Sequence, residues 1–494
     1  MRMIGLPAAV LLFIAHGSTG QEAALTKIDP LMRAVDLNIG QKQEVPMAGG
    51  KKATVKLLDV QENRDEVRGA LRQVRVIVEV NGERAEMVSA TYHLPITVAG
   101  VQIDCPITKG YLENGDHWGL EADARLRLWP AASPWIRPGT FSYPVDQRWF
   151  AGGTLMANEL GDDERPEDRT FYYHWGLDFG GAERLVTVMA ATDGVVVSAG
   201  EKVLEGEQLP SLVRPRYDVI YLRDGRGWYY RYSHLDSIAP TVSVGGRVKR
   251  GEKIGMLGKE GASGGWTHLH FDIVGPQPSG KYGVIDAYAF VWQVYHDQHA
   301  TEVEAVARPR QLAWIGEPVV LDGSRSWCRR GPEHIASYQW ILSNGRTATG
   351  PKAEIRYDRA GNYNETLKVT DDEGNTDYDF ARVKIADREH PEQQPPGVNA
   401  AYWPTFGIRV GEEVTFKARS FAVDRSDGQE EWDFGDGSPT ATTQSNSSGE
   451  AHAADGYATI THHYRGPGDY LVTVRRTNHR GEIGTDRLHV VVEP

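Results

Sequence analysis

Cysteine is scarce in this sequence: its 494 residues contain only Cys105 and Cys328. We place these two in different domains, so we expect no disulfide framework and domains that are held by large cores. After residue 20, no apolar run reaches the ~20 residues with which a helix spans a bilayer. Basic residues are outnumbered, 54 against 67 acidic ones, which gives a net charge of −13. That balance does not supply the broad positive surface that phosphate backbones attract, so we expect no nucleic-acid partner.

The first 20 residues have the pattern of a secretory signal. Arg2 gives a positive start, the segment 4–15 is almost wholly apolar, and Ser18-Thr19-Gly20 supplies small residues before a cleavage point. So short an apolar run cannot cross a bilayer, which favours a signal peptide at 1–20 over an uncleaved membrane anchor. We therefore expect an exported protein, whether periplasmic, at the cell surface or secreted, with no transmembrane segment once the signal is removed.

Turn-forming residues are abundant, with 54 Gly and 26 Pro, and the apolar residues between them come in short runs rich in Val, Thr and Tyr. This composition predicts an all-β chain. We place an N-terminal β domain at 21–142. Its segments 53–60 and 74–80 alternate as strands do, and Asn81-Gly82 has the chemistry of a type I′ hairpin turn. A second domain, at 143–300, consists of short apolar runs bounded by glycines.

The C-terminal part contains a diverged repeat. Trp340 and Tyr363 of the first copy correspond to Trp432 and Tyr470 of the second, and in each copy a glycine follows the Tyr by eleven residues. The repeat predicts two tandem β-sandwiches, the first sandwich at 301–390 and the second sandwich at 391–494. A charged, Pro-rich stretch between the copies, at 387–397, predicts a stiff linker at the start of the second unit.

The second copy contains the segment 432–438, Trp-Asp-Phe-Gly-Asp-Gly-Ser. This segment resembles the signature of the polycystic-kidney-disease (PKD) type of immunoglobulin-like sandwich, and the first copy keeps its Trp and turn Gly but lacks both Asp. Asp433 and Asp436 could be a calcium pair, yet an Asp beside Gly is much more commonly a turn former. For the two sandwiches we expect a glycan or protein ligand.

Histidine and aspartate side chains form a candidate metal site in the domain at 143–300. The segment that begins at His268 alternates as a strand, so His268 and His270 lie on one face. His174 and Asp178 are four residues apart, again on one face if the chain is extended, and Gly176 between them disfavours a helix. A His, an Asp and a second His are three N and O ligands, the number with which a catalytic zinc keeps a fourth position for water.

These residues fall in motifs that resemble those of the lysostaphin-type zinc endopeptidases. The motifs occur in the family's order over roughly 145–295; they are His174xxxAsp178, the segment 191–200, Tyr232-Ser-His234, the segment 242–255 and the segment 258–271. The resemblance implies a compact antiparallel β metallopeptidase domain in which His174, Asp178 and His270 bind Zn²⁺. It also implies that His268 and His234 are the catalytic pair, one acting as general base and the other stabilising the charge that develops on the scissile carbonyl.

The sequence departs from the family pattern in two places. Trp266-Thr267 stands where a Pro often precedes the two histidines, and an apparent insertion occupies 205–216. Both departures leave specificity open. The family often has a tyrosine that aids the oxyanion, but no motif singles out Tyr172 or Tyr173 for that role.

Three other histidine groups lack the same context. His117-Trp-Gly-Leu-Glu121 nearly repeats the segment from His174 to Asp178, but no HxH follows it in its own domain, so we interpret it as a coincidence of composition. Neither the pair His296 and His299 nor the pair His462 and His463 has the combined context of a carboxylate and an HxH, and we expect both pairs at the surface.

The resemblance favours an exported zinc metalloendopeptidase that hydrolyses the peptide stems or crosslinks of bacterial cell-wall peptidoglycan. The N-terminal domain would shield or position the cleft, and the sandwiches would hold the enzyme near its polymer. Two alternatives stay open at this point. One is a noncatalytic cell-wall regulator or scaffold, against which the presence of all five site residues counts, and the other is a surface binding protein that acts through its PKD-like domains.

Overall fold

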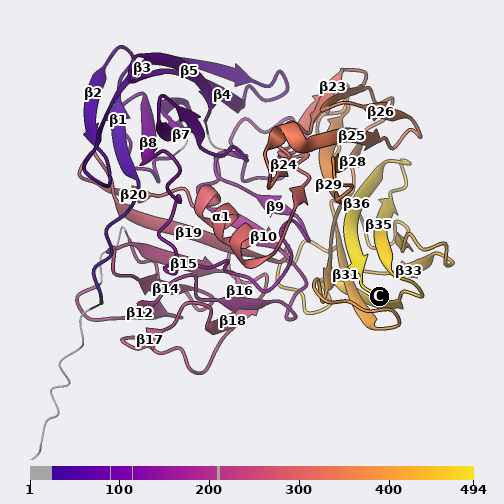
Figure 1. Cartoon of the computed structure of the whole chain (residues 1–494). Helices are drawn as coiled ribbons and strands as arrows, with labels where there is room; N and C mark the ends of the chain where they lie inside the picture. Colours follow the sequence, from indigo (N-terminus) through magenta and orange to yellow (C-terminus); the bar gives the residue numbers. More distant parts are fainter. Residues whose placement is uncertain (1–24, 90, 114, 208–211) are drawn as a thin grey trace, which may run out of the picture.

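The computed structural model describes residues 25–494 except 90, 114 and 208–211, so the predicted signal peptide at 1–20 lies outside the described residues. The described part of the chain is built almost wholly from strands, which confirms the predicted all-β class. Figure 1 shows the N-terminal domain stacked on the central domain, with the two sandwiches beside them. Among the described residues, no helix is long and apolar enough to cross a membrane. The domain boundaries given above stay a prediction.

The N-terminal domain consists of two sheets whose apolar faces share one core. One sheet has the order β1 (Arg33–Leu37), β8 (Ala124–Pro130), β7 (Val101–Thr108), β6 (Ile96–Val98), and the other β2 (Lys42–Pro46), β3 (Lys52–Arg64), β4 (Leu71–Val80), β5 (Glu83–Val88). Strands β4 and β5 form the predicted hairpin. Asn81 and Gly82 at its turn have φ of 48° and 90°, as a type I′ turn requires. Cys105 in β7 and the distant Cys328 are both buried free thiols.

The central domain is organised around one long sheet that carries the predicted site. Its order is β13 (Lys202–Val203), β12 (Gly194–Ala199), β14 (Ile220–Arg223), β15 (Tyr229–Ser233), β19 (His268–Pro276), β10 (Leu177–Gly180), β9 (Thr154–Leu155), with β17 (Arg247–Val248) on β12 and β20 (Tyr282–Val284) on β19. A smaller sheet contains β11 (Thr187–Met189), β18 (Lys253–Leu257) and β16 (Leu235–Ile238). Every pairing is antiparallel, as expected.

The one α-helix of the described residues, α1 (Tyr288–Gln298), lies in the middle of the molecule against the central sheet (Figure 1). Its side chains are apolar on nearly all sides, which is typical of a helix buried within a protein. The expectation that His296 is a surface residue is wrong. This residue belongs to α1 and is only 5% exposed, because the helix buries almost every face, and its Nδ1 bonds to the carbonyl oxygen of Trp292.

The C-terminal part forms the two predicted sandwiches. The first contains β21 (Val303–Glu304), β22 (Gln311–Trp314), β23 (Val319–Asp322), β24 (Trp327–Cys328), β25 (Ile335–Ile341), β26 (Thr347–Thr349), β27 (Lys352–Ile355), β28 (Gly361–Asp371) and β29 (Thr376–Ala386). The second contains β30 (Gly397–Trp403), β31 (Glu413–Phe421), β32 (Glu430–Asp433), β33 (Ala441–Thr443), β34 (Ala458–His463), β35 (Gly468–Thr477) and β36 (Ile483–Val492). Trp340 and Trp432 are fully buried, one in each core. Asp433 and Asp436 accept backbone N–H groups two residues on, as turn formers do.

The two sandwiches are joined more closely than the predicted linker suggests. Strands β28 and β36 pair in parallel at Gly361–Ile483 and Asn362–Gly484, so one nine-stranded sheet runs through both units. Figure 1 shows this sheet as a continuous band from orange to yellow. Because backbone hydrogen bonds cross the boundary, the two sandwiches form one block.

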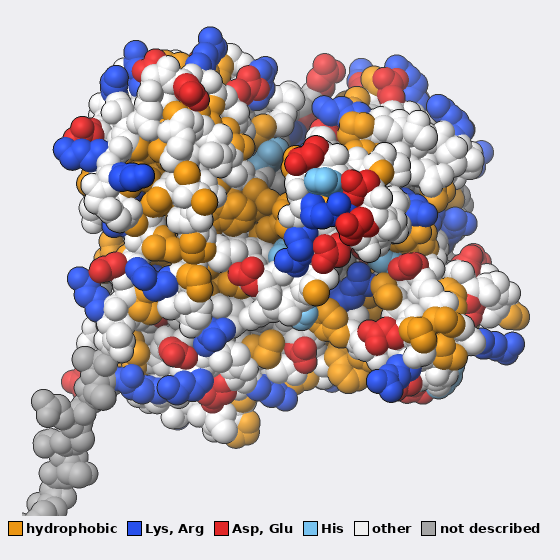
Figure 2. Space-filling view, viewed as in Figure 1, with side chains coloured by type: hydrophobic (Ala, Val, Ile, Leu, Met, Phe, Trp, Pro, Cys, Tyr) orange, Lys and Arg blue, Asp and Glu red, His pale blue; other side chains and the backbone are white. Residues whose placement is uncertain are grey.

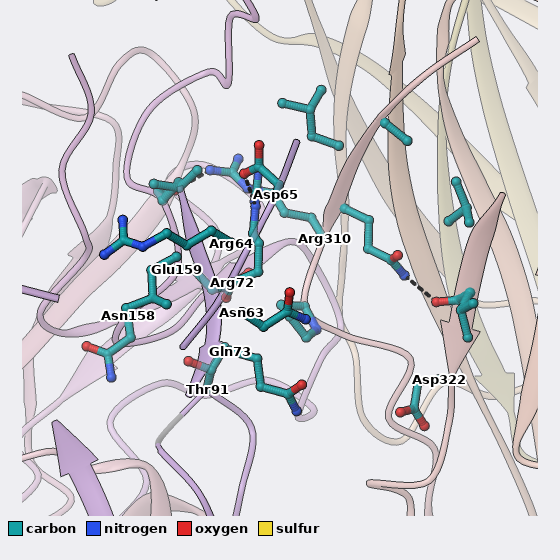
Figure 3. A pocket seen from close by; sticks show the side chains of 18 of the residues that line it. Asn63, Arg64, Asp65, Arg72, Gln73, Thr91, Asn158, Glu159, Arg310 and Asp322 are labelled. Carbon is teal, nitrogen blue, oxygen red and sulfur yellow. Dashed lines mark hydrogen bonds and ion pairs between the residues drawn. The ribbon is translucent and has the colours of Figure 1, made fainter. Parts of the chain in front are cut away.

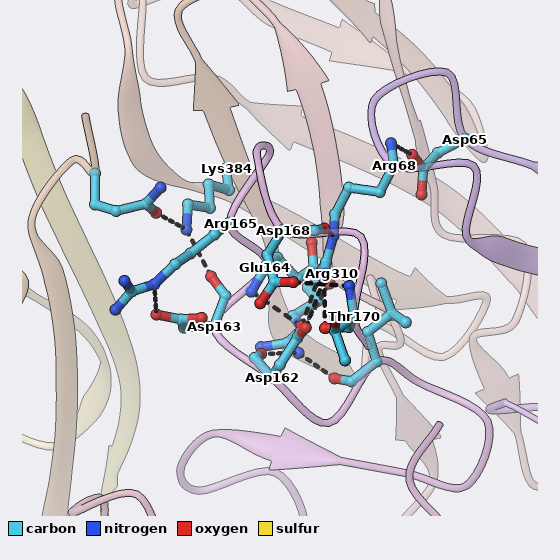
Figure 4. A network of polar contacts seen from close by, with 12 residues as sticks. Asp65, Arg68, Asp162, Asp163, Glu164, Arg165, Asp168, Thr170, Arg310 and Lys384 are labelled. Carbon is cyan, nitrogen blue, oxygen red and sulfur yellow. Dashed lines mark hydrogen bonds and ion pairs between the residues drawn. The ribbon is translucent and has the colours of Figure 1, made fainter. Parts of the chain in front are cut away.

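A charged loop at 161–170 ties this block to the N-terminal domain (Figure 4). The loop leads from the central sheet toward His174. Its contacts are Arg68–Asp162 (2.7 Å), Arg72–Glu164 (2.9 Å), Arg310–Glu164 (3.1 Å) and Lys384 Nζ to the carbonyl oxygen of Asp163 (2.6 Å). Glu164 therefore forms ion pairs with an arginine of the N-terminal domain and with an arginine of the first sandwich.

We predict that Gly484→Ala opens the junction between the sandwiches. A Cβ at Gly484 would lie 2.8 Å from the carbonyl carbon of Pro396, which is backbone and cannot move freely. We expect a loss of about 1–3 kcal/mol in the free energy of unfolding, the usual cost of overpacking, measured by urea titration. Gly397→Ala is the control, since its Cβ would meet Phe421 at an ordinary 3.6 Å. Equal stability of the two variants would contradict this account.

Glu164 should make the protein acid-sensitive. Burial raises the pKa of this carboxyl, but Arg72 and Arg310 outweigh burial and bring the pKa to about 2. A depressed pKa contributes stability above the unfolded value near 4.5, and that contribution is lost as the pH falls toward 2. We expect Glu164→Gln to cost roughly 3 kcal/mol at pH 7 and progressively less below pH 4.5, measured by denaturant titration. The exposed Glu167→Gln is the control, and a difference that does not change with pH would contradict the assignment.

Candidate active site

Asp178 and His270 lie side by side on neighbouring strands of the central sheet. They are directly paired in the antiparallel ladder between β10 and β19, so both side chains project from the same face. His174 lies before β10 rather than in it, which differs from the extended segment expected from its spacing. Backbone hydrogen bonds hold it there: its N–H donates to the carbonyl oxygen of Glu159, and its carbonyl accepts the N–H of Asn158, both at 2.8 Å.

One atom from each of these three side chains converges on a common point. Nε2 of His174 lies 2.9 Å from Nδ1 of His270, and both nitrogens lie close to Oδ1 of Asp178, at 3.1 and 2.9 Å. The donors of a tetrahedral zinc site lie about 3.3 Å apart when each bond is about 2.05 Å long. The side chains of His174, Asp178 and His270 could thus hold a metal ion.

The charge of the cluster also suits a cation. Asp178 is buried, which raises its pKa, but the neighbouring His174 and His268 outweigh burial and keep that pKa well below the ordinary value. A buried carboxylate anion is costly unless a positive charge compensates it. Two ring nitrogens and this carboxylate oxygen point at one another. A divalent cation between them would accept one lone pair from each of the three atoms.

Asp272 supports the cluster from behind, and sequence reasoning missed it. Nε2 of His270 donates a hydrogen bond to Oδ2 of Asp272 at 3.0 Å, which leaves Nδ1 of that ring to face the cluster. Arg231 stands 3.7 Å from the same carboxylate oxygen. A carboxylate behind a histidine ligand fixes its tautomer and raises its basicity. The even spacing of Asp272 from His270 in strand β19 is the signal that could have found it.

The other two predicted residues, His268 and His234, lie beside the cluster with their rings 4.6 Å apart. Nδ1 of His268 bonds to the carbonyl oxygen of Trp266 at 3.1 Å, and Nδ1 of His234 bonds to that of Glu260 at 2.7 Å. A carbonyl only accepts, so each Nδ1 carries the proton and each Nε2 has a free lone pair. Nε2 of His268 lies 3.6 Å from Asp178.

Both of these rings are neutral at physiological pH. Burial lowers the pKa of His268 to about 4 and lowers that of His234 well below its ordinary value. His234 also has a φ of 69°, in the left-handed region that non-glycine residues rarely adopt. Its N–H donates to Oδ2 of the buried Asp218 at 3.0 Å. A neutral imidazole with an available lone pair can act as a general base.

The structure separates the two tyrosines that sequence left unassigned. Tyr173 is buried and its hydroxyl accepts the N–H of Leu71 from the N-terminal domain, at 2.7 Å. Tyr172 is 42% exposed and lines the cleft of the site. His117 is not remote from the site, because its ring stacks at 3.8 Å on Trp175, which follows His174. The contact joins the N-terminal domain to the segment that carries this candidate ligand.

The five predicted residues line one cleft of about 830 Å³. The central domain supplies one wall. The opposite wall comes from β28, β29 and β30 of the two sandwiches and includes Asn364, Phe380, Arg382 and Asn399. Any molecule that reaches the cluster through this cleft therefore passes between the central domain and the sandwiches.

A second hollow, of about 680 Å³, lies between the N-terminal domain and the first sandwich. Figure 2 shows the surface drawn in between these two lobes, and Figure 3 shows Arg72, Gln73 and Thr91 on one side of the hollow with Arg310 and Asp322 on the other. It contains none of the five predicted site residues.

Comparison with protein families identifies three parts of the chain. Residues 172–281 match the model of peptidase family M23, and this stretch contains all five predicted site residues. Residues 301–385 and 399–492 each match a PKD domain model. The suspected resemblance is confirmed in both its parts.

Individual relatives are more distant. The chain is 33% identical over 104 residues to the pre-pro-metalloprotease PrtV of Vibrio cholerae serotype O1, covering 21% of this chain and 10% of that protein. It thus spans about a tenth of the length of the curated relatives it matches. Among solved structures, the antimicrobial peptidase lysostaphin from Staphylococcus simulans is 15% identical, with a TM-score of 0.23 over 49% of this chain and 92% of that one. Csd3 of Helicobacter pylori is 16% identical, with a TM-score of 0.21 over 50% and 54%.

We predict that Asp272→Asn weakens divalent metal binding. An amide no longer offers the negative charge that raises the basicity of His270, and losing such a partner typically costs 10–100-fold in metal affinity. The measurement is zinc competition against a chelating dye. Asp193→Asn, which changes a carboxylate that only accepts the N–H of Arg250, is the control. Unchanged zinc affinity in Asp272→Asn would contradict a supporting role.

Proposed function

Because the chain carries a peptidase domain of family M23 followed by two PKD domains, we propose that it is an exported zinc endopeptidase that hydrolyses peptide crosslinks of bacterial peptidoglycan. The observation that carries the proposal is the convergence of His174, Asp178 and His270 beside two neutral histidines. Those three residues would hold the zinc ion. When bound, zinc supplies a Lewis acid that polarises the scissile carbonyl and acidifies water.

The histidines next to the cluster carry the proton chemistry. Nε2 of His268 takes the proton from the attacking water, since its lone pair is free and its ring is neutral. The ring of His234 lies 4.6 Å from that of His268, and we assign it to the carbonyl oxygen on which negative charge develops. To stabilise that charge, His234 must donate from Nε2; the proton that His268 takes from the water would therefore pass on to Nε2 of His234, which leaves His268 neutral again.

The alternative of a noncatalytic scaffold is disfavoured by the same residues. A protein that had lost catalysis would have no need to keep three potential ligands together with two carbonyl-anchored histidines. The proposal also places the protein outside the cytoplasm, because its substrate is the cell wall and its leader has the pattern of an export signal.

Digestion of purified peptidoglycan tests the proposal. The protein without residues 1–20 is incubated with sacculi, and released fragments are identified by mass spectrometry. We expect new amino and carboxyl ends in the peptide part, loss of activity with a chelator, and recovery with zinc. Cleavage confined to glycan bonds, or no cleavage by zinc-loaded protein, would overturn it.

Two alanine variants separate ligand from base. We expect His270→Ala to lose both bound zinc and hydrolysis, because it removes one of three ligands. His268→Ala should keep near-stoichiometric zinc while kcat falls at least ~100-fold, the usual contribution of a general base. Zinc is measured by atomic emission and turnover with a crosslinked peptide. The exposed His463→Ala is the control, and equal zinc loss in the two site variants would refute the assigned roles.

A further inference from the structure

The loop that precedes the HxH strand is held by the second sandwich. We call residues 258–267 the histidine loop. The N–H of Thr267 donates to the hydroxyl oxygen of Tyr457 at 2.9 Å, and Arg419 donates to the carbonyl oxygen of Gly265 at 2.8 Å. Nε2 of His452 bonds to the carbonyl oxygen of Gly261 at 2.8 Å. The second sandwich therefore forms hydrogen bonds with both halves of this loop.

Tyr457 and Arg419, which contact the histidine loop, are themselves held by further hydrogen bonds. Tyr457 is buried and its hydroxyl donates to Oδ1 of Asn399 at 2.7 Å, which orients it to accept from Thr267. Arg419 is 2% exposed and also donates to the carbonyl oxygens of Ala451 and Glu450, at 2.7 and 2.6 Å. Buried groups held by several hydrogen bonds keep one arrangement, so they are suited to position what they touch.

The histidine loop in turn orients both histidines of the proposed proton chemistry. The carbonyl oxygen of Trp266 accepts a hydrogen bond from Nδ1 of His268, and that of Glu260 accepts one from Nδ1 of His234. The ring of Trp266 stacks on that of His268 at 3.9 Å with an interplanar angle of 15°. A small shift of this loop would therefore move two rings and loosen the bonds that fix their tautomers.

The candidate metal ligands have different supports. Asp178 and His270 are set by the ladder between β10 and β19, and His174 by backbone bonds to residues 158 and 159. The contacts of Tyr457, Arg419 and His452 instead fall on the histidine loop. A substitution at these contacts in the second sandwich should therefore change the orientation of His268 and His234 without changing metal binding.

We infer that Tyr457 and Arg419 are positioning residues of the active site, through which the second PKD domain sets the orientation of His268 and His234. This inference rests on the proposed function, since it assumes the proton-transfer roles of these two rings. It makes the PKD domain a working part of the peptidase, in addition to any ligand that it binds.

The test uses full-length protein without residues 1–20 and the variant Tyr457→Phe, which removes only the hydroxyl group. We expect kcat to fall about tenfold with KM within twofold, because misplaced catalytic groups slow the chemical step. Zinc content should stay at the wild-type level, and hydrogen–deuterium exchange should rise in peptides covering 258–268. His452→Ala, at an exposed residue, should change kcat and exchange in the same direction by less.

Tyr464→Phe is the matched control. It removes a buried hydroxyl of the same domain that bonds to the carbonyl oxygen of Phe434, away from the histidine loop. A wild-type kcat and wild-type loop exchange in Tyr457→Phe would overturn the inference, as would an equal loss in Tyr464→Phe or a loss of zinc. If the wild-type protein failed to cleave any peptide, the proposed function would fail, while faster exchange confined to the loop of Tyr457→Phe would still support the positioning contact.

Discussion

The register between β10 and β19 is the constraint on which the site depends. It places Asp178 opposite His270, and a slip of one residue would bring Leu269 opposite Asp178 and turn both histidines of this strand to the other face. The core opposes such a slip, since Leu269 and Phe271 are fully buried on the reverse side. On its other edge β19 pairs with β15, where Ser233 lies opposite His270 and His234 follows immediately. One strand therefore sets the position of most of the cluster.

The remaining parts of the site also receive contacts from outside the central domain. His174 has no strand of its own, and the segment around it is anchored by the hydroxyl of Tyr173 on Leu71 and by the stack of Trp175 on His117. The histidine loop is anchored by the second sandwich. The segment around His174 thus has additional contacts from the N-terminal domain, and the histidine loop has contacts from the second sandwich.

Local patterns were sufficient to predict much of this. Strand alternation identified β19 and the face shared by His268 and His270, and Asn-Gly identified the hairpin between β4 and β5. The fold class followed from such patterns, and both domain families followed from motifs that resemble those of known families. The sequence could not predict contacts between distant segments, because the periodicity within each segment does not show which other segment it meets. The stack of His117 on Trp175 is one such contact, because nothing in either segment encodes that they meet. His296 was misplaced because a helix apolar on all sides lacks the one-sided pattern that distinguishes buried from exposed positions.

The join between the sandwiches gives these long-range contacts their rigidity. If the two units moved independently, the hydrogen bonds from the second sandwich to the histidine loop would have to withstand that motion alone. The parallel pairing of β28 with β36 prevents this, and the charged loop fastens the first sandwich to the N-terminal domain. The block formed by the sandwiches is thus held at the charged loop and at the histidine loop, both of which line the cleft. Residues of the central domain and of both sandwiches line this cleft, so its width depends on the sandwiches as well as on the peptidase domain.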